Sequence, residues 1–286
     1  AFDAFGSATA PAVLLISGLG TQMTRWPDAF CQALADRGFH VIRFDNRDAG
    51  LSIHLPHLPP PDFADLARTL MSGRKPEIPY TLHDMAADVV GLMARLDIAK
   101  AHVVGRSMGG MIAQILASDW PERILSLTSI MSATGNPQMP PSDPAIMALM
   151  QTPAPDPAGD EEAFVANRIA FARAIAGTAS PFDEDREREL ILEDLRRAYD
   201  PAGTARQLAA MAAAGDRRDR LSTITCPALV IHGTEDRMIR TECGRDTAEA
   251  IPGARLVLLD GMGHDFPLIH QPRMIEEIVE TARAAQ

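Results

Sequence analysis

Short apolar runs alternate with segments of helical periodicity in the first half of the chain. The run at 12–17 is apolar at almost every position, which is typical of a strand buried on both faces. In the segment 81–96, Met85, Val89 and Leu92 recur at helical spacing behind a polar start. The pattern predicts strands at 12–17, 40–44, 102–105 and 124–131 and helices at 26–37, 81–96 and 108–118.

The same alternation resumes after residue 228. It predicts strands at 228–232 and 255–259 and helices at 241–250 and 273–284. Because strands alternate with helices, we expect a mostly parallel sheet that is covered by helices on both faces. Right-handed crossovers then connect the strands. The predicted class is therefore α/β.

The middle of the chain follows a different pattern. Seven prolines fall within residues 137–157, and no sheet strand tolerates that density. We predict a helical lid at 135–214, inserted into an α/β core made of residues 1–134 and 215–286. A second proline-rich stretch, at 56–61, is expected to be a loop.

The stretch 183–200 within this lid is highly charged. It places Glu184 and Arg188, and also Glu193 and Arg197, four residues apart. Such pairs stabilise a helix that faces water, so we expect a solvated helix that carries these two ion pairs.

Composition narrows the range of partners. The chain has 286 residues, of which 46% are apolar and 23% charged, and its formal net charge is −11. These values fit a globular protein, and the acidic excess argues against nucleic acid or an anionic membrane surface as a partner. No apolar run approaches the roughly 20 residues that cross a bilayer.

The cysteines and the start of the chain bear on its compartment. Three scattered cysteines without a C-x-x-C pair favour neither a disulfide framework nor a metal site. We therefore expect a cytoplasmic protein, although a chain that begins at Ala1 without Met is compatible with a removed leader.

The sequence Gly105-Arg106-Ser107-Met108-Gly109 is a G-x-S-x-G motif. A predicted strand precedes it and a predicted apolar helix follows it, which is the context that the motif requires. Ser107 would occupy a strained turn, and the two glycines leave room for it. We expect its hydroxyl to project at the carboxyl edge of the sheet as a nucleophile.

A serine nucleophile needs a base, and His264 has the best position among eight histidines. It follows the strand at 255–259 through a glycine-rich loop, so it lies at the same edge as Ser107. Among the alternatives, His40 and His102 begin predicted strands, and His54 and His57 lie in a proline-rich loop. His83 begins a predicted helix, and His232 ends a predicted strand.

The base in turn needs a carboxylate to orient it. Asp236 follows the strand at 228–232 and precedes His264, which gives the order Ser, Asp, His. Glu235 is its nearest rival, while Asp260 lies too close to the end of its own strand.

Acyl transfer also requires two N–H donors for the oxyanion. We expect one from the backbone of Met108 and the other from Leu19, in the loop after the first strand. The glycines beside Leu19 do not form a dinucleotide-binding fingerprint, because Met23 stands where that pattern needs a small residue.

Together, the Ser107 turn and the loops that carry Asp236 and His264 resemble the α/β-hydrolase superfamily over nearly the whole chain. The segment 43–52 is similar to that family's D-x-R-G-x-G-x-S turn, from which Asp48 and Gly50 depart slightly. The resemblance implies the α/β-hydrolase fold, with Ser107, Asp236 and His264 at the triad positions.

The wider pattern is similar to bacterial serine esterases, including the aclacinomycin methylesterase type. The segments that carry this similarity are 26–28, 40–43 and 261–264. Ser17 stands where many members have histidine, which leaves the backbone donor of the oxyanion loop in place. The resemblance further implies that the family's first strands lie before Ala1.

These features predict a carboxylesterase that forms an acyl-enzyme on Ser107 and hydrolyses small to medium esters without a cofactor or a metal. Its partner would be a small-molecule ester, and its oligomeric state stays open. The motif also resembles enol-lactonases, C–C hydrolases and cofactor-free haloperoxidases of the superfamily. A ligand-binding protein on this fold is a further alternative.

The predicted lid offers apolar side chains for a substrate wall. Methionine is flexible and fits irregular ligands, although such residues also commonly pack within their own helices. The candidates are Met139, Met147, Met150, Phe164 and Phe171.

Overall fold

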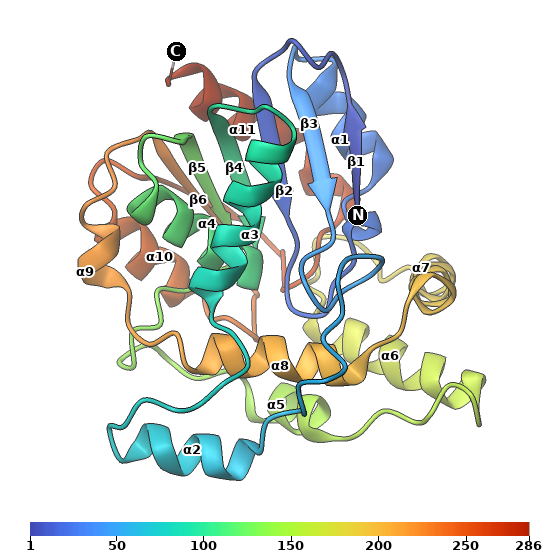
Figure 1. Cartoon of the computed structure of the whole chain (residues 1–286). Coiled ribbons are helices and arrows are strands. Elements are labelled where there is room, and N and C mark those ends of the chain that lie inside the picture. The colour runs from blue at the N-terminus through green and yellow to red at the C-terminus, as the bar shows by residue number, and fades with distance from the viewer. Residues whose placement is uncertain (286) are drawn as a thin grey trace.

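The computed structural model describes residues 1–285 and contains a seven-stranded sheet (Figure 1). The strands lie in the order β1-β3-β2-β4-β5-β6-β7, and each pairing is parallel except that of β1 with β3. Their bounds are β1 (Phe2–Phe5), β2 (Ala12–Ile16), β3 (His40–Phe44), β4 (Ala101–Arg106), β5 (Ile124–Ile130), β6 (Ala228–Gly233) and β7 (Arg255–Leu259).

Helices cover both faces of the sheet and its carboxyl edge. They are α1 (Asp28–Ala35), α2 (Phe63–Met71), α3 (Leu82–Arg95), α4 (Met108–Asp119), α5 (Pro144–Gln151), α6 (Glu161–Ile175), α7 (Glu184–Arg197), α8 (Pro201–Ala212), α9 (Arg218–Leu221), α10 (Thr241–Ala250) and α11 (Gln271–Arg283), with short 3₁₀ helices at Met23–Arg25 and Leu268–His270. The α/β class expected from the sequence is confirmed.

Two apolar clusters enclose the sheet because successive residues of a strand point to opposite faces. Leu14 of β2 belongs to the cluster that contains Met85 of α3. Its neighbour Leu15 belongs to the cluster on the other face, together with Phe30 of α1 and Ile278 of α11. All five residues of β2 are buried, which explains its unbroken apolar run.

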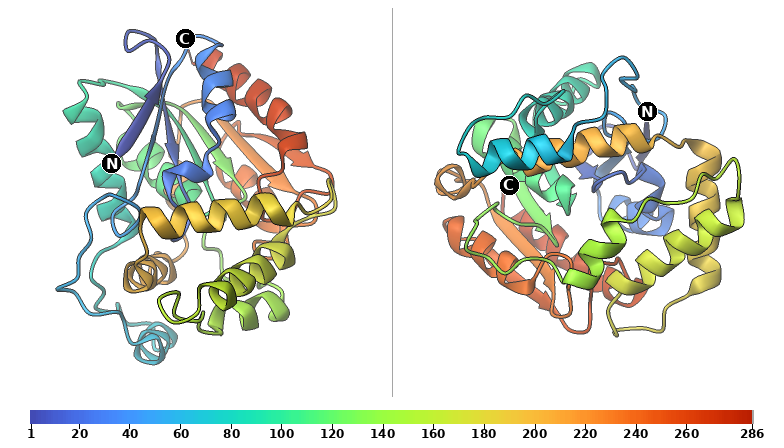
Figure 2. Two further views of the ribbon diagram at one scale, coloured as in Figure 1. Left: turned by 90° about the vertical axis from the view of Figure 1, so that its right-hand side faces the viewer. Right: turned by 90° about the horizontal axis from the view of Figure 1, so that it is seen from below.

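Between β5 and β6 the chain forms helices α5 to α8, which we call the cap (residues 144–212). These helices lie across the carboxyl edge of the sheet, and Figure 2 shows them from below. The proposed division into a core and a lid stays a prediction. Helix α8 also contacts α3 of the core.

The edge strand β1 was not among the strands predicted from the sequence. Phe2–Phe5 pairs antiparallel with β3, from Phe2 opposite Phe44 to Phe5 opposite Val41. The strand has four residues and alternates between exposed and half-buried positions. A segment this short and this exposed gives a weak hydrophobic pattern. Helix α2, of which only Leu66 is buried, was not predicted either.

Helix α7 forms as expected, but not with the two ion pairs predicted within it. Arg188 instead binds Glu162 of α6, and Arg197 binds Asp45, which follows β3. Ile191 is buried in a small core between α6 and α7. Acids in other elements thus replace the acids one helical turn away as partners of the two arginines. These ion pairs attach the charged helix on two sides.

Among the helices of residues 1–285, none is long and apolar enough to cross a membrane.

Candidate active site

Ser107 occupies the turn between β4 and α4, at the centre of the carboxyl edge. Its backbone has φ 54° and ψ −123°, a region that residues other than glycine rarely adopt. The flanking glycines make the turn possible. A Cβ on Gly105 would lie 2.0 Å from the carbonyl oxygen of Gly109, and one on Gly109 would lie 2.1 Å from that of Ile16. No larger side chain fits at either position.

The structure brings Ser107, His264 and Asp236 together from three separate loops. Nε2 of His264 lies 3.0 Å from Oγ of Ser107. Nδ1 of the same ring lies 2.7 Å from Oδ2 of Asp236. An ionised carboxylate only accepts hydrogen bonds, so Nδ1 donates to it, and Nε2 is then free to accept the hydroxyl proton of Ser107.

Asp236 is held in place by its own loop. Its Oδ1 accepts the backbone N–H groups of Met238 at 2.9 Å and Ile239 at 2.8 Å, which leaves Oδ2 directed at His264. Burial alone would raise the pKa of this carboxyl. The charge of His264 and hydrogen bonds from His232 and His264 outweigh burial and lower the pKa well below its usual value. Asp236 is therefore an anion beside the imidazole.

The rival carboxylates have other partners. Glu235 accepts hydrogen bonds from both the backbone and the hydroxyl of Thr178, which follows α6. Asp260 accepts from the hydroxyl of Thr234. Glu235 thus connects the cap to the Asp236 loop and does not contact His264.

The two proposed oxyanion donors belong to segments that adjoin Ser107. Met108 begins α4, and the Leu19 loop follows β2, where a Cβ on Gly18 would lie 3.3 Å from Cβ of Ser107. Within residues 1–285, neither backbone N–H donates to another group of the protein. Both donors are thus free for a ligand oxygen.

The Leu19 loop is also anchored to the cap. The backbone N–H of Gly20 donates to Oε1 of Gln207 on α8 at 2.8 Å. The amide of Gln207 in turn donates to the carbonyl of Arg47 at 2.7 Å. One cap side chain therefore connects the Leu19 loop to the turn after β3.

The segment between α6 and α7 packs against the loop that carries His264. The backbone N–H of His264 donates to the carbonyl of Ile175 at 2.7 Å, and that of Ala179 donates to the carbonyl of Gly261 at 2.8 Å. Between these bonds, a Cβ on Gly177 would lie 2.0 Å from the oxygen of Gly261. The position of His264 therefore depends on this part of the cap.

The five lid residues predicted to form a substrate wall lie in different environments. Phe164 is buried in the small core between α6 and α7, and Met147 on α5 is 38% exposed. Met139, Met150 and Phe171 are half-buried. Their role in binding a substrate stays a prediction.

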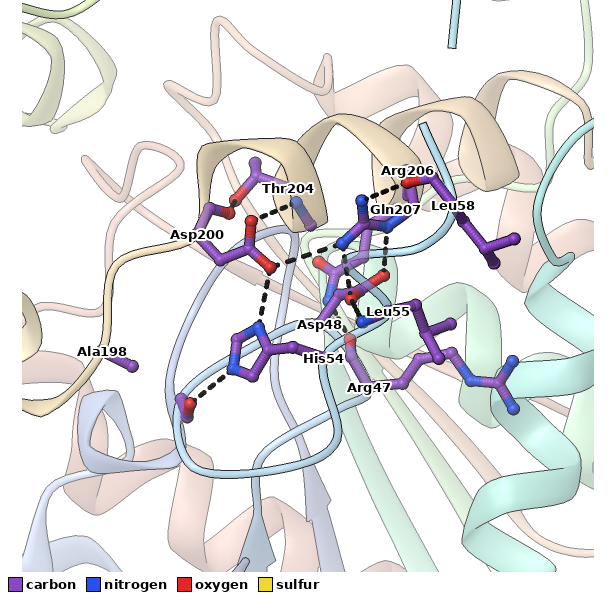
Figure 3. A network of polar contacts seen from close by, with 12 residues as sticks. Arg47, Asp48, His54, Leu55, Leu58, Ala198, Asp200, Thr204, Arg206 and Gln207 are labelled. Carbon is purple, nitrogen blue, oxygen red and sulfur yellow. Dashed lines mark hydrogen bonds and ion pairs between the residues drawn. The ribbon is translucent and has the colours of Figure 1, made fainter. Parts of the chain in front are cut away.

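A buried polar network, which the sequence did not reveal, fixes the cap to the turn after β3 (Figure 3). Arg206 of α8 donates to both oxygens of Asp48 at 2.8 Å, and the arginine is 1% exposed. Tyr80 donates to the same carboxylate. Burial would raise the pKa of Asp48, but these hydrogen bonds lower it below its usual value.

This network explains why the motif at 43–52 departs from its family pattern. Asp48 stands where that pattern has glycine, and its backbone has φ 62°. The residue accepts this strained conformation while its carboxylate binds Arg206.

The same network contains three side chains with the chemistry of metal ligands. One ligand atom from each of Asp48, His54 and Asp200 lies within 4.8 Å of the other two. The guanidinium of Arg206 reaches both carboxylates and supplies the positive charge between them.

The sheet order and the loops at its carboxyl edge define a hydrolase of the α/β class. The chain belongs to the alpha/beta hydrolase fold family, whose model matches residues 11–271. Rhodomycin D methylesterase DauP of Streptomyces sp. (strain C5) is 31% identical over 293 residues, which span 94% of this chain and 90% of the relative. DnrP of Streptomyces peucetius, with the same enzyme name, is 30% identical over 94% of this chain and 90% of the relative.

Solved structures share the fold. The enol-lactonase from Burkholderia xenovorans LB400 superposes with a TM-score of 0.69 at 24% identity, covering 99% of this chain and 96% of the other. The resemblance to bacterial esterases of the methylesterase type that the sequence indicated is confirmed.

Proposed function

We propose that this protein is a serine carboxylesterase that hydrolyses small to medium carboxylic esters through an acyl-enzyme on Ser107. One observation carries the proposal: Nε2 of His264 lies 3.0 Å from Oγ of Ser107 while Nδ1 faces Asp236 at 2.7 Å. Since two similar proteins are named methylesterases, methyl esters are the first substrates to test.

In the first half of the reaction, Oγ of Ser107 attacks the ester carbonyl. His264 takes the hydroxyl proton at Nε2, and the anion of Asp236 stabilises the imidazolium that results. The negative charge on the tetrahedral oxygen is held by the backbone N–H groups of Leu19 and Met108. Collapse of this intermediate breaks the bond to the alcohol, which leaves with the proton from His264.

In the second half, water replaces the alcohol. His264 removes a proton from water, the hydroxide attacks the acyl-enzyme, and the same two N–H groups hold the oxyanion. The acid leaves when the bond to Oγ breaks, and His264 returns the proton to Ser107. The cycle regenerates the enzyme without a cofactor.

The decisive experiment compares wild type with Ser107→Ala on p-nitrophenyl and methyl esters. We expect a fall in kcat of about 10⁴-fold or more, because the oxyanion donors and binding alone supply the remaining rate. A fluorophosphonate probe should label the wild type at Ser107 and leave the variant unlabelled. Equal rates in the two proteins would refute the proposal.

The same site geometry serves other reactions of the superfamily. Lactones and diketones should therefore be assayed beside simple esters, since an enol-lactonase or C–C hydrolase would turn these over faster. A ligand-binding protein would turn over none of them and would fail to react with the probe.

A further inference from the structure

Arg106 directly precedes the proposed nucleophile, and its side chain lies on two aromatic rings. Its guanidinium carbon lies 4.9 Å from the ring centre of Trp26 and 5.5 Å from that of Phe266. Phe266 itself follows His264 by two residues, so the stacked cation is flanked by both proposed catalytic loops. Trp26 is fully buried, which makes the stacking surface rigid.

The guanidinium has no acidic partner. Within residues 1–285, no hydrogen bond or ion pair joins the guanidinium of Arg106 to another side chain or to a backbone group. The side chain is half-buried, as is Ser107. Stacking covers the faces of the guanidinium but leaves its N–H groups, which lie in the plane, without acceptors. These N–H groups are therefore free to donate to an anion, and charge-assisted hydrogen bonds of this kind are the stronger ones.

The neighbourhood of Arg106 carries an excess of positive charge. The two nearby acids are already paired with Arg25, which binds Glu187 at 2.8 Å and Asp194 at 2.6 Å. Burial and the charge of Arg25 lower the pKa of Arg106 to about 10, only partly offset by these acids.

A second cation without an acidic partner faces the same group of charges. The guanidinium of Arg168 on α6 lies over the ring of Phe171, and among the described residues it makes no ion pair. Burial and Arg25 lower its pKa, as they do for Arg106. The guanidinium groups of Arg25, Arg106 and Arg168 thus face two acids, so this neighbourhood keeps one positive charge for an anion in a chain of net charge −11.

We propose that Arg106 is a specificity-determining residue that binds a free carboxylate of the substrate, so that the preferred substrates are half-esters of dicarboxylic acids. This inference rests on the proposed esterase function and adds the substrate class. A planar guanidinium with free N–H edges matches a carboxylate in a bidentate arrangement. Because Arg106 adjoins Ser107, the bound carboxylate would hold the ester group of the same short molecule near Oγ.

Binding can be measured without turnover. Isothermal titration of Ser107→Ala with glutarate probes the anion site directly. We expect Arg106→Gln in the same background to weaken glutarate binding at least 10-fold, since a charge-assisted hydrogen bond is lost, and Arg106→Lys to recover part of the affinity. Arg188→Gln, which removes a cap arginine that is already paired with Glu162, should bind glutarate like its parent. Equal binding by all variants would overturn the proposal.

Kinetics then test selectivity. Wild type should have a higher kcat/KM for monomethyl glutarate than for dimethyl glutarate. Arg106→Gln should lose at least 10-fold on the half-ester and less than about 3-fold on the diester, which also shows that the variant is folded. Arg168→Gln should shift the ratio in the same direction. Equal losses on both esters, or a wild type that prefers the diester, would overturn the proposal.

The two proposals fail in different ways. If neither ester is hydrolysed while glutarate still binds through Arg106, the esterase function is wrong and the anion site stands. If the diester is hydrolysed with full dependence on Ser107 but glutarate does not bind, the esterase function stands and the substrate class is wrong.

Discussion

Nδ1 of His54, in the turn after β3, lies 2.7 Å from Oδ2 of Asp200, the residue that caps helix α8. Nε2 of the same ring lies 2.8 Å from the carbonyl oxygen of Gly50, which can only accept. Both contacts are satisfied when both ring nitrogens donate, so the folded protein favours the imidazolium form of His54. Burial lowers its pKa, but the Gly50 carbonyl and the Asp200 carboxylate raise it above the usual value.

His54→Gln should consequently destabilise the protein more at low pH than at high pH. A group whose pKa is higher in the folded state contributes its full stabilisation below the pKa of the unfolded state, about 6.5. The contribution disappears as the pH rises through the folded value. We expect about 1 kcal/mol, or about 2 °C in Tm, at pH 5.5, because the ring is partly screened by solvent. Thermal melts should show a smaller difference at pH 9, and a larger one there would contradict this view.

Asp236→Asn should abolish most activity while leaving the fold intact. The amide oxygen can still accept the N–H groups of Met238 and Ile239, but the amide nitrogen cannot accept from Nδ1 of His264. The imidazole then adopts the wrong tautomer, and kcat should fall by about 10⁴-fold with little change in Tm. Glu235→Gln, which makes the same chemical change one residue away, should cost less than about 10-fold. Similar losses in both would show that Asp236 has no special role.

Gly177→Ala should impair both stability and turnover. The new Cβ would lie 2.0 Å from the oxygen of Gly261 and 2.4 Å from the nitrogen of Gly263, so the backbone of the His264 loop must move. We expect a loss of about 1–3 kcal/mol in the free energy of unfolding, together with a lower kcat.

Gly91→Ala is the matched control, because a Cβ at this exposed position of α3 meets nothing within 4 Å. It should stabilise the protein by up to about 1 kcal/mol and leave kcat unchanged. Denaturant unfolding and ester assays of both variants test this pair. A Gly177→Ala enzyme with normal kcat would show that the cap segment does not position His264.

Arg206→Met should destabilise the protein strongly. Removal of the guanidinium leaves the carboxylate of Asp48, whose side chain is 0% exposed, without its charge partner. Breaking a buried ion pair in this way costs about 3–5 kcal/mol, measurable as a lower midpoint of urea unfolding. Arg218→Met breaks a pair with Asp216 at the surface and should leave the midpoint unchanged. An equal shift in both variants would mean that burial of the Asp48 pair is unimportant.

The parts of the fold that the sequence predicted are those with a strong local pattern. The strand at 40–44 and the helix at 241–250 were predicted with the bounds that the structure has. Thr81 and Asp84 form a capping box at the start of α3, where the sequence predicted a helix from residue 81. In each case the pattern of burial or the capping chemistry is contained in a few consecutive residues.

The features that the sequence missed depend on partners far along the chain. β1 has too few buried positions to give a pattern, and the ion pairs of α7 form with Glu162 and Asp45 and not within the helix. The unpaired guanidinium of Arg106 was not predicted either, because the sequence of the motif does not show whether an acidic side chain from another element lies beside this arginine.

The sequence by itself determined the buried strands, the helices between them and the three loops that carry Ser107, Asp236 and His264, because hydrophobic period and glycine placement are local properties. Only the tertiary structure decided which charges meet: that Asp236 faces His264 while Glu235 holds the cap, that Arg206 neutralises Asp48, and that Arg106 stacks on Trp26 without an acid. Electrostatic partners are chosen by distance in space, and that distance depends on how the cap folds back onto the sheet.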